Sequence, residues 1–315
     1  MSEFPTGSWA LILGGSSGFG LATAQKLAEQ GMNIAVVHRD RRGAMTRIEP
    51  EFEKLRGLGV EFCSWNVDAI SPEKRAEVLD QLGALLTGSS RVRVLLHSIA
   101  FGNLKLIAPE KVQPRTAAAA LAERLGVEPD ALVQAADEIF GEGDEDGLHP
   151  LTSAPEYPER SYLDEDDFAR TILSMGTSLL GWVQELFRRG LFADDARVFG
   201  LTSEGNEVAW KGYGAVSAAK VSLEALARSI AVEFGPHGVR CNVVQAGVTE
   251  TPALAAIPGS AHLKAQARLR NPLGRLTTPQ DVASVIHLLS LPAAGWINGE
   301  VIRVDGGEHI SGATR

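Results

Sequence analysis

Residues 8–38 have the sequence SWALILGGSSGFGLATAQKLAEQGMNIAVVH. The runs 8–13 and 33–38 are short and apolar, which is typical of strands buried on both faces of a parallel sheet. Between them, residues 21–30 have apolar side chains at helical spacing, and Gly31 follows as a helix terminator. The order of strand, glycine-rich turn, helix and strand predicts a dinucleotide-binding unit.

The turn of this unit is rich in glycine. Three residues separate Gly14 from Gly18, which differs from the opening of the standard fingerprint. Glycine lets a pyrophosphate approach the backbone and the amino end of the following helix, where free N–H groups favour an anion. The residues of this turn that we expect to bind a cofactor are Gly14, Ser17, Gly18, Phe19 and Gly20.

The alternation of strands and helices continues along the chain. We expect strands near 60–68, 92–100, 196–202, 238–245 and 299–304, and helices near 51–58, 72–86, 164–189, 213–234 and 278–290. This pattern predicts an α/β fold with a Rossmann-type doubly wound parallel sheet, in which residues 1–315 form a single domain.

One segment, 103–162, interrupts this alternation. It contains two predicted helices, 116–125 and 130–140, then an acidic loop over 141–147 and a proline-spaced segment over 150–158. Such long excursions are uncommon within compact domains and are often lids or binding loops. The segment follows the fourth strand on the side of the sheet where ligands bind. We therefore expect a helical insertion that is either a lid or a surface decoration or oligomer contact.

Composition narrows the class of protein. The chain has 315 residues, a net charge of −9 and a pI of about 5.4, which argue against a nucleic-acid-binding or membrane-binding surface. We find neither a run of about 18 apolar residues nor a basic segment followed by an apolar run at the N-terminus. Cys63 and Cys241 lack metal-ligand spacing, so we expect no metal and a reducing, cytoplasmic location.

The end of the second strand bears on the choice of cofactor. Arg39 stands at the strand tip, with Arg42 close behind it. A free ribose 2′-hydroxyl usually meets an acid at this position, whereas a 2′-phosphate meets arginine. The arginines favour NADPH over NADH, although Asp40 is a competing acid.

Three further groups of residues are expected to contact the cofactor, because each follows a strand at the carboxyl edge of the sheet. They are Asn66 and Val67 at the adenine end, Ser98, Ile99 and Ala100 after the fourth strand, and Gly247, Val248, Thr249 and Thr251 after the sixth strand. We interpret His97, at the end of the fourth strand, as a packed histidine with a satisfied hydrogen bond.

Tyr213 and Lys220 are the candidate catalytic residues. They lie seven positions apart, on one face of the predicted helix 213–234. A cation beside a tyrosine favours the phenolate, so we expect Lys220 to lower the pKa of Tyr213. The pair could give a proton, or a strong hydrogen bond, to an oxygen that gains negative charge. Ser203 ends the preceding strand and can point its hydroxyl into the same space.

Together these motifs resemble the short-chain dehydrogenase/reductase superfamily over nearly the whole chain except 103–162. The resemblance also includes Val304-Asp-Gly-Gly307 near the C-terminus. Most members have three residues between the tyrosine and the lysine. The six found here, together with His97-Ser98-Ile99, resemble the divergent enoyl-acyl-carrier-protein reductases of bacterial fatty-acid synthesis.

This resemblance implies that NADPH delivers a hydride to the β carbon of a trans-2-enoyl thioester. Tyr213 would bind the thioester oxygen, and Lys220 would hold the nicotinamide ribose hydroxyls. The resemblance also implies acyl carrier protein or coenzyme A as the carrier, and a homotetramer. We expect a substrate loop at 253–273, and a basic patch for an acidic carrier could come from Arg268, Arg270 and Arg275.

Ser203 leaves a second reaction open. Many enoyl reductases have another tyrosine ten residues before the catalytic one, and here that position is Ser203, which also matches the catalytic serine of ordinary members. A ketoacyl or other carbonyl or alcohol oxidoreductase is therefore the alternative. A non-catalytic NADPH-binding regulator is a third interpretation, against which the intact Tyr213 and Lys220 argue.

Overall fold

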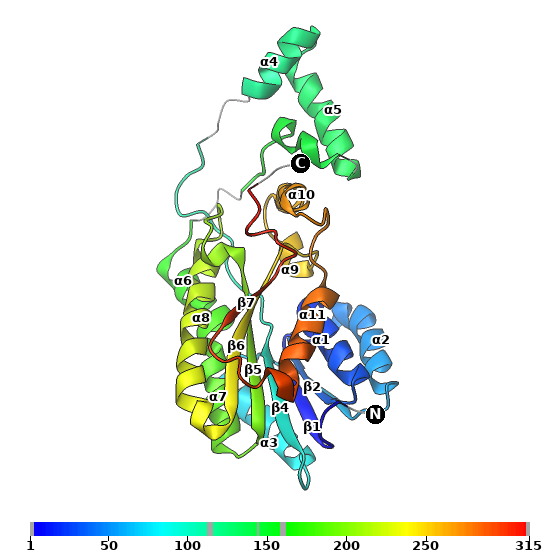
Figure 1. Cartoon of the computed structure of the whole chain (residues 1–315). Helices are drawn as coiled ribbons and strands as arrows, with labels where there is room; N and C mark the ends of the chain where they lie inside the picture. The colour runs from blue at the N-terminus through cyan, green and yellow to red at the C-terminus, as the bar shows by residue number, and fades with distance from the viewer. Residues whose placement is uncertain (1–2, 112–115, 144, 158–161, 313–315) are drawn as a thin grey trace.

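A parallel sheet of seven strands forms the centre of the protein (Figure 1). The computed structural model describes residues 3–111, 116–143, 145–157 and 162–312. The strands lie in the order β3-β2-β1-β4-β5-β6-β7. Their bounds are β1 Ser8–Leu13, β2 Asn33–His38, β3 Phe62–Asn66, β4 Arg91–His97, β5 Phe192–Ser203, β6 Val239–Ala246 and β7 Val301–Val304. The order changes direction between β1 and β4, which is where ligands bind in sheets of this kind. The predicted fold class is confirmed.

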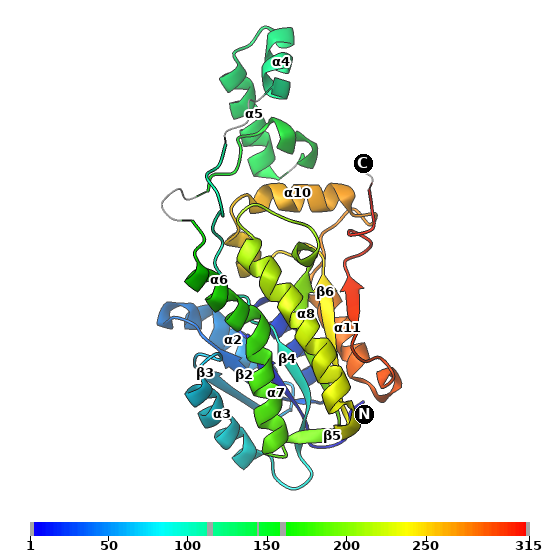
Figure 2. The ribbon, with the colours of Figure 1, turned by 90° about the vertical axis from the view of Figure 1, so that its left-hand side faces the viewer.

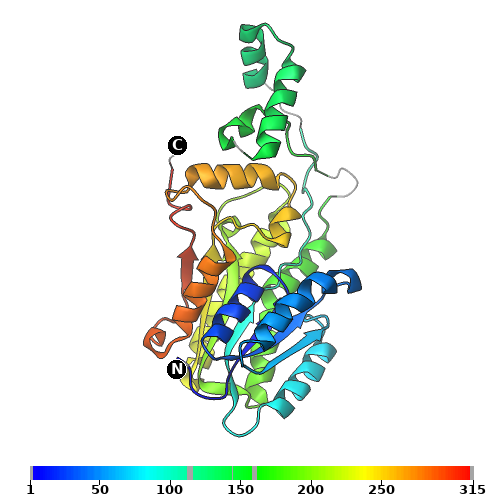
Figure 3. The same cartoon turned by 90° about the vertical axis from the view of Figure 1, so that its right-hand side faces the viewer.

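Helices cover both faces of the sheet. Successive side chains of β1 point to opposite faces, so Leu11 belongs to one hydrophobic core and Ile12 to the other. The first face is covered by α3 (Pro72–Leu85), α7 (Ser178–Arg188) and α8 (Gly214–Phe234) (Figure 2). The opposite face is covered by α1 (Gly18–Glu29), α2 (Met45–Arg56) and α11 (Pro279–Ser290) (Figure 3). Within the described residues, no helix is both long and apolar enough to cross a bilayer.

The starts of two surface helices follow from local hydrogen bonding. Ser71 accepts a hydrogen bond from the backbone N–H of Lys74, and Pro72 occupies the first position of α3. Thr278 and Asp281 form a reciprocal capping box at the start of α11. The predicted starts near 72 and 278 are therefore confirmed. Short 3₁₀ turns are found at Arg42–Ala44, Glu204–Asn206, Gly235–His237 and Pro292–Ala294.

Three predicted elements differ from the structure. Helix α2 (Met45–Arg56) begins six residues before the helix predicted near 51–58, and Pro50 lies inside it. The helix predicted at 164–189 is divided into α6 (Glu165–Ile172), a π-helical turn (Leu173–Thr177) and α7. The predicted substrate loop at 253–273 contains two helices, α9 (Pro252–Ala255) and α10 (Ser260–Arg270).

Small side chains explain the position of the π-helical turn. Ser174 donates a hydrogen bond to the Phe101 carbonyl after β4. A Cβ atom at Gly176 would lie 2.7 Å from the Ala219 carbonyl, so α8 passes too close for a larger residue. Of the small residues in this helix, Ser174 faces the side of the candidate site, whereas Gly176 packs against α8. A π-helical turn beside a functional site is a recurring association.

The insertion forms a separate helical projection. Helices α4 (Thr116–Leu125) and α5 (Pro129–Glu142) confirm the two predicted helices, and they lie beyond α10 on the side away from the sheet (Figures 1 and 2). A 3₁₀ helix, Asp146–Leu151, leads the chain back to α10. Asp144 and Pro158, which belong to the predicted acidic loop and proline-spaced segment, lie outside the described residues.

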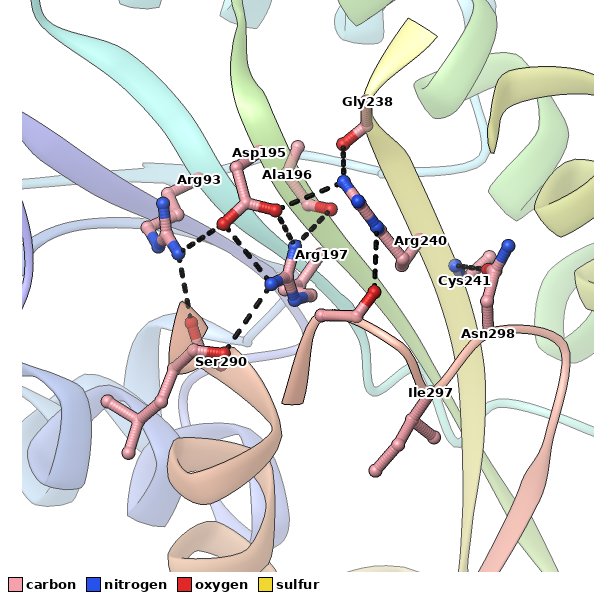
Figure 4. A network of polar contacts seen from close by, with 12 residues as sticks. Arg93, Asp195, Ala196, Arg197, Gly238, Arg240, Cys241, Ser290, Ile297 and Asn298 are labelled. Carbon is pink, nitrogen blue, oxygen red and sulfur yellow. Dashed lines mark hydrogen bonds and ion pairs between the residues drawn. The ribbon is translucent and has the colours of Figure 1, made fainter. Parts of the chain in front are cut away.

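A cluster of charged residues stabilises the amino-terminal end of the sheet (Figure 4). The Asp195 carboxylate accepts from Arg93 at 2.8 Å, from Arg197 at 3.2 Å and from Arg240 at 3.1 Å. Arg93 and Arg197 also donate to backbone carbonyls at the carboxyl end of α11, at 3.4 and 3.5 Å. Cations are favourable at that end of a helix. The cluster therefore joins β4, β5 and β6 to α11.

Candidate active site

A cavity of about 890 Å³ opens at the carboxyl ends of β1, β4, β5 and β6. Many of the predicted residues line it, although they come from distant parts of the sequence. The predicted cofactor-binding residues in its lining are Gly14, Ser17, Gly18, Phe19, Arg39, Val67, Ser98, Ile99, Ala100, Gly247, Val248, Thr249 and Thr251. The candidate catalytic residues Ser203, Tyr213 and Lys220 also line it. Gly20, Arg42 and Asn66 lie outside the lining.

Ser203, Tyr213 and Lys220 lie along one wall of the cavity. Ser203 is the last residue of β5, and Tyr213 is the N-cap residue of α8. The Oγ atom of Ser203 lies 3.3 Å from the hydroxyl of Tyr213. Lys220 is buried, and its Nζ atom donates to the Leu201 carbonyl at 2.8 Å. This arrangement supplies two hydroxyl groups for a reacting oxygen and one fixed ammonium group.

Burial determines the acidity of these groups. Burial raises the pKa of Tyr213 above its ordinary value, and the hydrogen bond with Ser203 opposes this only in part. The expected lowering of the Tyr213 pKa by Lys220 is therefore wrong, because the effect of burial dominates. Burial also lowers the pKa of Lys220 to about 8, against an opposing effect of Glu224. At neutral pH, Tyr213 therefore keeps its proton and can donate a hydrogen bond.

The glycine turn fits a pyrophosphate group. Gly14 has a φ of +86°, and a Cβ atom there would lie 2.4 Å from the Ser98 carbonyl oxygen. A Cβ atom at Gly20 would lie 2.2 Å from the Gly14 carbonyl oxygen, so Gly20 lets α1 approach the turn without lining the cavity. Ser17 is the N-cap residue of α1, and among the described residues its side chain caps none of the first N–H groups. These N–H groups are therefore suited to bind an anion.

Arg39 is the basic side chain at the tip of β2 that lines the cavity. Its Nη1 atom lies 3.0 Å from the Asp68 carboxylate, and its guanidinium group lies 4.2 Å from the centre of the Phe101 ring. Asp40 lies outside the cavity lining, with its carboxylate 2.9 Å from Nδ1 of His38. Arg42 is exposed and lies outside the lining. The competing acid is thus engaged with His38, and one of the two predicted arginines remains at the cofactor site.

Asn66 has a supporting position. Its amide donates to the Asp40 carbonyl at 3.0 Å and accepts from the Asp40 N–H at 2.9 Å. This pair of hydrogen bonds joins the ends of β2 and β3. Asn66 therefore fixes the backbone at the tip where Arg39 stands.

His97 is a packed histidine, as predicted. Its ring is buried, and Nε2 lies 2.8 Å from the hydroxyl of Ser178 on α7. Burial lowers its pKa to about 3, and the Lys220 charge acts in the same direction. A neutral imidazole in this place supports the end of β4 and the adjacent residues Ser98 and Ile99.

The turn after β6 is closely packed. A Cβ atom at Gly247 would lie 2.5 Å from Oγ1 of Thr277, so the position has no room for a side chain. Thr249 donates to the Gly247 carbonyl at 2.9 Å, and Thr251 accepts from the Leu254 N–H at 3.1 Å as the N-cap residue of α9. These hydrogen bonds fix the turn in the shape that lines the cavity.

Glu308 is a residue of this region that the sequence analysis missed. Its buried carboxylate accepts from the Val248 N–H at 3.2 Å and from Arg270 at 3.0 Å. Burial raises the Glu308 pKa, whereas Arg270 acts to lower it. Arg270 also makes two hydrogen bonds with Glu204, which follows Ser203. The available signal was the position of Glu308 directly after Val304-Asp-Gly-Gly307.

The wall opposite the glycine turn is largely apolar. Ala253, Ile257 and Leu263 from α9, α10 and their connection line the cavity. Pro155 and Tyr157 of the insertion also line it, and the sequence analysis did not identify them. An apolar wall of this kind suits a substrate with an alkyl portion.

The predicted basic patch is not formed. Arg268 makes two hydrogen bonds with Asp146, and Arg270 is engaged with Glu204 and Glu308. The third member, Arg275, pairs with Asp281 at the start of α11. Each arginine is therefore neutralised by a carboxylate of the same chain, and the expectation of a patch that is free for an acidic carrier is wrong.

The fold and the cavity define the class of protein. A doubly wound sheet with a glycine turn, together with a serine, a tyrosine and a lysine on one cavity wall, is the arrangement of a nicotinamide-dependent oxidoreductase. A family model described as Enoyl-(Acyl carrier protein) reductase matches residues 129–309, and one described as short chain dehydrogenase matches residues 8–113. The chain belongs to the short-chain dehydrogenase/reductase family.

Individual relatives carry different activities in their names. A tropinone reductase homolog of Arabidopsis thaliana is 24% identical over 97% of this chain and 92% of its own length. The NADH-dependent enoyl-[acyl-carrier-protein] reductase FabI of Bacillus cereus is 32% identical, over 39% of this chain and 48% of its own length. The FabI structure from Candidatus Liberibacter asiaticus superposes with a TM-score of 0.72 at 18% identity, over 100% of both chains. The last comparison concerns the fold alone.

Proposed function

We propose that this oxidoreductase uses NADPH to reduce the trans-2 double bond of an enoyl thioester in fatty-acid biosynthesis. The main support is the position of Tyr213 ahead of α8, with six residues between it and Lys220. The family model that covers residues 129–309 and the partial similarity to FabI support the same reaction. The apolar wall from α9 and α10 gives the acyl chain a place to bind.

Each residue of the cavity wall has a distinct task in this reaction. Tyr213 donates a hydrogen bond to the thioester oxygen, which gains negative charge when the hydride reaches the β carbon, and the enolate then takes a proton from water at its α carbon. Its raised pKa keeps the hydroxyl proton in place at neutral pH. Ser203 orients the Tyr213 hydroxyl across 3.3 Å, and the Lys220 ammonium binds ribose hydroxyls. NADPH held at the glycine turn would supply the hydride.

We propose NADPH as the preferred cofactor because of the charges at the tip of β2. Arg39 lines the cavity and stacks on Phe101, whereas the Asp40 carboxylate is turned toward His38. A guanidinium group in this place suits a 2′-phosphate, which would replace its present partner, the Asp68 carboxylate of the cavity lining at 3.0 Å.

We also propose a homotetramer and a thioester on a carrier. Val221 and Val232 on α8 are 48% and 76% exposed, and Trp296 after α11 is 96% exposed. Such apolar groups on two sides of the subunit suit contacts with further copies. The carrier is acyl carrier protein or coenzyme A, and the engagement of Arg268, Arg270 and Arg275 means that an acidic carrier would have to dock without them.

A second reaction has one specific observation in its favour. Ser203 lies within 3.3 Å of Tyr213, and the serine, tyrosine and lysine together are also suited to reduce a carbonyl group. The full-length similarity to a tropinone reductase homolog points the same way. Reduction of a ketoacyl thioester is therefore the alternative.

One comparison separates the two reactions. NADPH oxidation is followed with a trans-2-enoyl thioester and with the β-ketoacyl thioester of the same chain length. We expect turnover of the enoyl substrate and little turnover of the ketoacyl substrate. Turnover of the ketoacyl substrate alone would reject the enoyl reductase in favour of the alternative.

A further inference from the structure

The last described part of the insertion contributes side chains to the cavity lining. Pro155 and Tyr157 both line the cavity. A Cβ atom at Gly259, the N-cap residue of α10, would lie 2.6 Å from Cγ of Pro155. A Cβ atom at Gly212, the residue before Tyr213, would lie 3.3 Å from Cε1 of Tyr157. The segment therefore extends from α10 to the loop that positions Tyr213.

Two polar contacts hold this segment on α10. Both oxygens of Asp146 accept from Arg268, at 2.6 and 2.5 Å. The buried hydroxyl of Thr152 lies 2.8 Å from Nε2 of His262. His262 itself lines the cavity, so the second contact joins the insertion directly to the cavity lining.

Helix α5 supports the same segment from the other side. The Asp137 carboxylate accepts from the N–H and the hydroxyl of Ser153, each at 2.7 Å. The Phe140 ring lies 5.2 Å from the His262 ring. Residues 146–157 are thus held between α5 and α10 by side chains on both helices. An insertion that only decorated the surface would not need these contacts with His262, which lines the cavity.

We propose that residues 146–157, here called the pocket wall, determine which acyl chains the enzyme accepts, with Tyr157 as the main specificity-determining residue. Tyr157 lies beside the loop of Tyr213 and Pro155 lies beside α10, so a long acyl chain contacts more of the pocket wall than a short chain does. This proposal rests on the proposed function for the chemical identity of the substrate. The placement of the pocket wall against the cavity does not depend on the reaction.

The ion pair between Asp146 and Arg268 allows a test by charge exchange. Asp146→Arg and Arg268→Asp are made singly and together, and Tyr157→Ala is made alone. Glu142→Arg is the matched control, because this exposed acid of α5 undergoes the same charge change in the same insertion. Substrates are crotonyl and dodecenoyl thioesters of N-acetylcysteamine, which remove the carrier from the comparison.

We expect each single exchange and Tyr157→Ala to raise KM for the dodecenoyl thioester about tenfold, because apolar contact with the chain is lost. In the two single charge exchanges, KM for the crotonyl thioester and kcat for both substrates should stay within about twofold, whereas Tyr157→Ala should raise KM more for the dodecenoyl than for the crotonyl thioester. The double exchange should restore KM for the dodecenoyl thioester, and Glu142→Arg should behave like the wild type. Equal KM ratios for the two substrates in the wild type and all the single variants would overturn the proposal.

A binding measurement distinguishes failure of the pocket wall from failure of the proposed reaction. Calorimetry gives the affinity of the saturated dodecanoyl thioester, which needs no turnover. The wild type could reduce no enoyl thioester and still bind the saturated ester about tenfold more tightly than Asp146→Arg does. In that case the proposed reaction is wrong, and the proposed role of the pocket wall is supported. Equal binding by the wild type, Asp146→Arg and Tyr157→Ala would reject the pocket wall, whatever the reaction.

Discussion

The Nζ atom of Lys220 donates to the Leu201 carbonyl at 2.8 Å, which fixes a buried ammonium group at the end of β5. Because burial lowers the pKa of Lys220 to about 8, this group loses its charge within an accessible pH range. The ammonium form is present below that pKa and is lost as the pH rises through it. We predict that kcat/KM for NADPH falls above a pH of about 8, measured at saturating thioester. Lys220→Arg, which stays charged, should shift the decline to higher pH. An unchanged pH profile in that variant would show that the decline does not come from deprotonation of Lys220.

Ser203 and Tyr213 should differ in their contributions. We predict that Tyr213→Phe reduces kcat by about 10²- to 10⁴-fold, because the donor to the reacting oxygen is lost. Ser203→Ala should reduce kcat for the enoyl substrate by less than about tenfold, since Ser203 acts through Tyr213. NADPH affinity, measured by fluorescence titration, should be retained in both variants. Equal losses in the two variants would support the carbonyl-reducing alternative.

Arg39 should determine cofactor selectivity. We predict that Arg39→Ala reduces kcat/KM for NADPH by about 10- to 100-fold and leaves kcat/KM for NADH nearly unchanged. A loss of this size is expected when a hydrogen bond to a charged group is removed. Arg42→Ala is the matched control, because Arg42 is exposed and lies outside the cavity lining. If the wild type uses NADH and NADPH with equal efficiency, the role of Arg39 is wrong.

Asp195 should stabilise the fold without contributing to the reaction. Its carboxylate is 37% exposed, but it neutralises Arg197, which is 1% exposed. The partial exposure of Asp195 reduces the cost of breaking its ion pairs. We therefore predict that Asp195→Asn lowers the free energy of unfolding by about 2 kcal/mol, below the usual range for breaking a buried ion pair. Chemical denaturation measures the change, and Asp194→Asn, an exposed neighbour, is the control.

The same carboxylate makes stability dependent on pH. Burial tends to raise the pKa of Asp195, but hydrogen bonds from Arg197 and Arg93 outweigh it and lower the pKa. A lowered pKa in the folded state means that this stabilisation is present above the unfolded pKa and is lost as the pH falls through the folded value. The difference in stability between the wild type and Asp195→Asn should therefore shrink in acid, and a constant difference would contradict this account.

The order of elements could be predicted from the sequence because β1 and β2 are nearly continuous apolar runs, and the later strands contain apolar stretches that alternate with helical patterns. The turn from β1 into α1 was predictable for the same reason, since Gly14 and Gly18 occur between such runs. Periodicity could not locate the π-helical turn, because Ser174 and Gly176 fit an α-helix equally well. It also could not detect α9 and α10, whose apolar residues Leu254 and Leu263 line the cavity.

Side-chain direction was the main property that the sequence did not determine. The seven-residue separation placed Tyr213 and Lys220 on one face of a helix, but it did not show that the Lys220 ammonium bonds to Leu201. The expected shift of the Tyr213 pKa had the wrong sign because burial of this side chain, which the sequence did not reveal, raises the pKa. Arg268 is a similar case, because its partner Asp146 lies 122 positions away in the insertion.

The most direct measurement is the mass of the product formed from a trans-2-enoyl thioester and NADPH that carries deuterium at the transferred position of the nicotinamide. The account predicts a saturated thioester with one deuterium on the β carbon, formed by the wild type and at least about 10²-fold more slowly by Tyr213→Phe. Recovery of unchanged enoyl thioester, with a deuterated 3-hydroxyacyl thioester formed from the β-ketoacyl substrate, would contradict it and show that Ser203, Tyr213 and Lys220 reduce a carbonyl group.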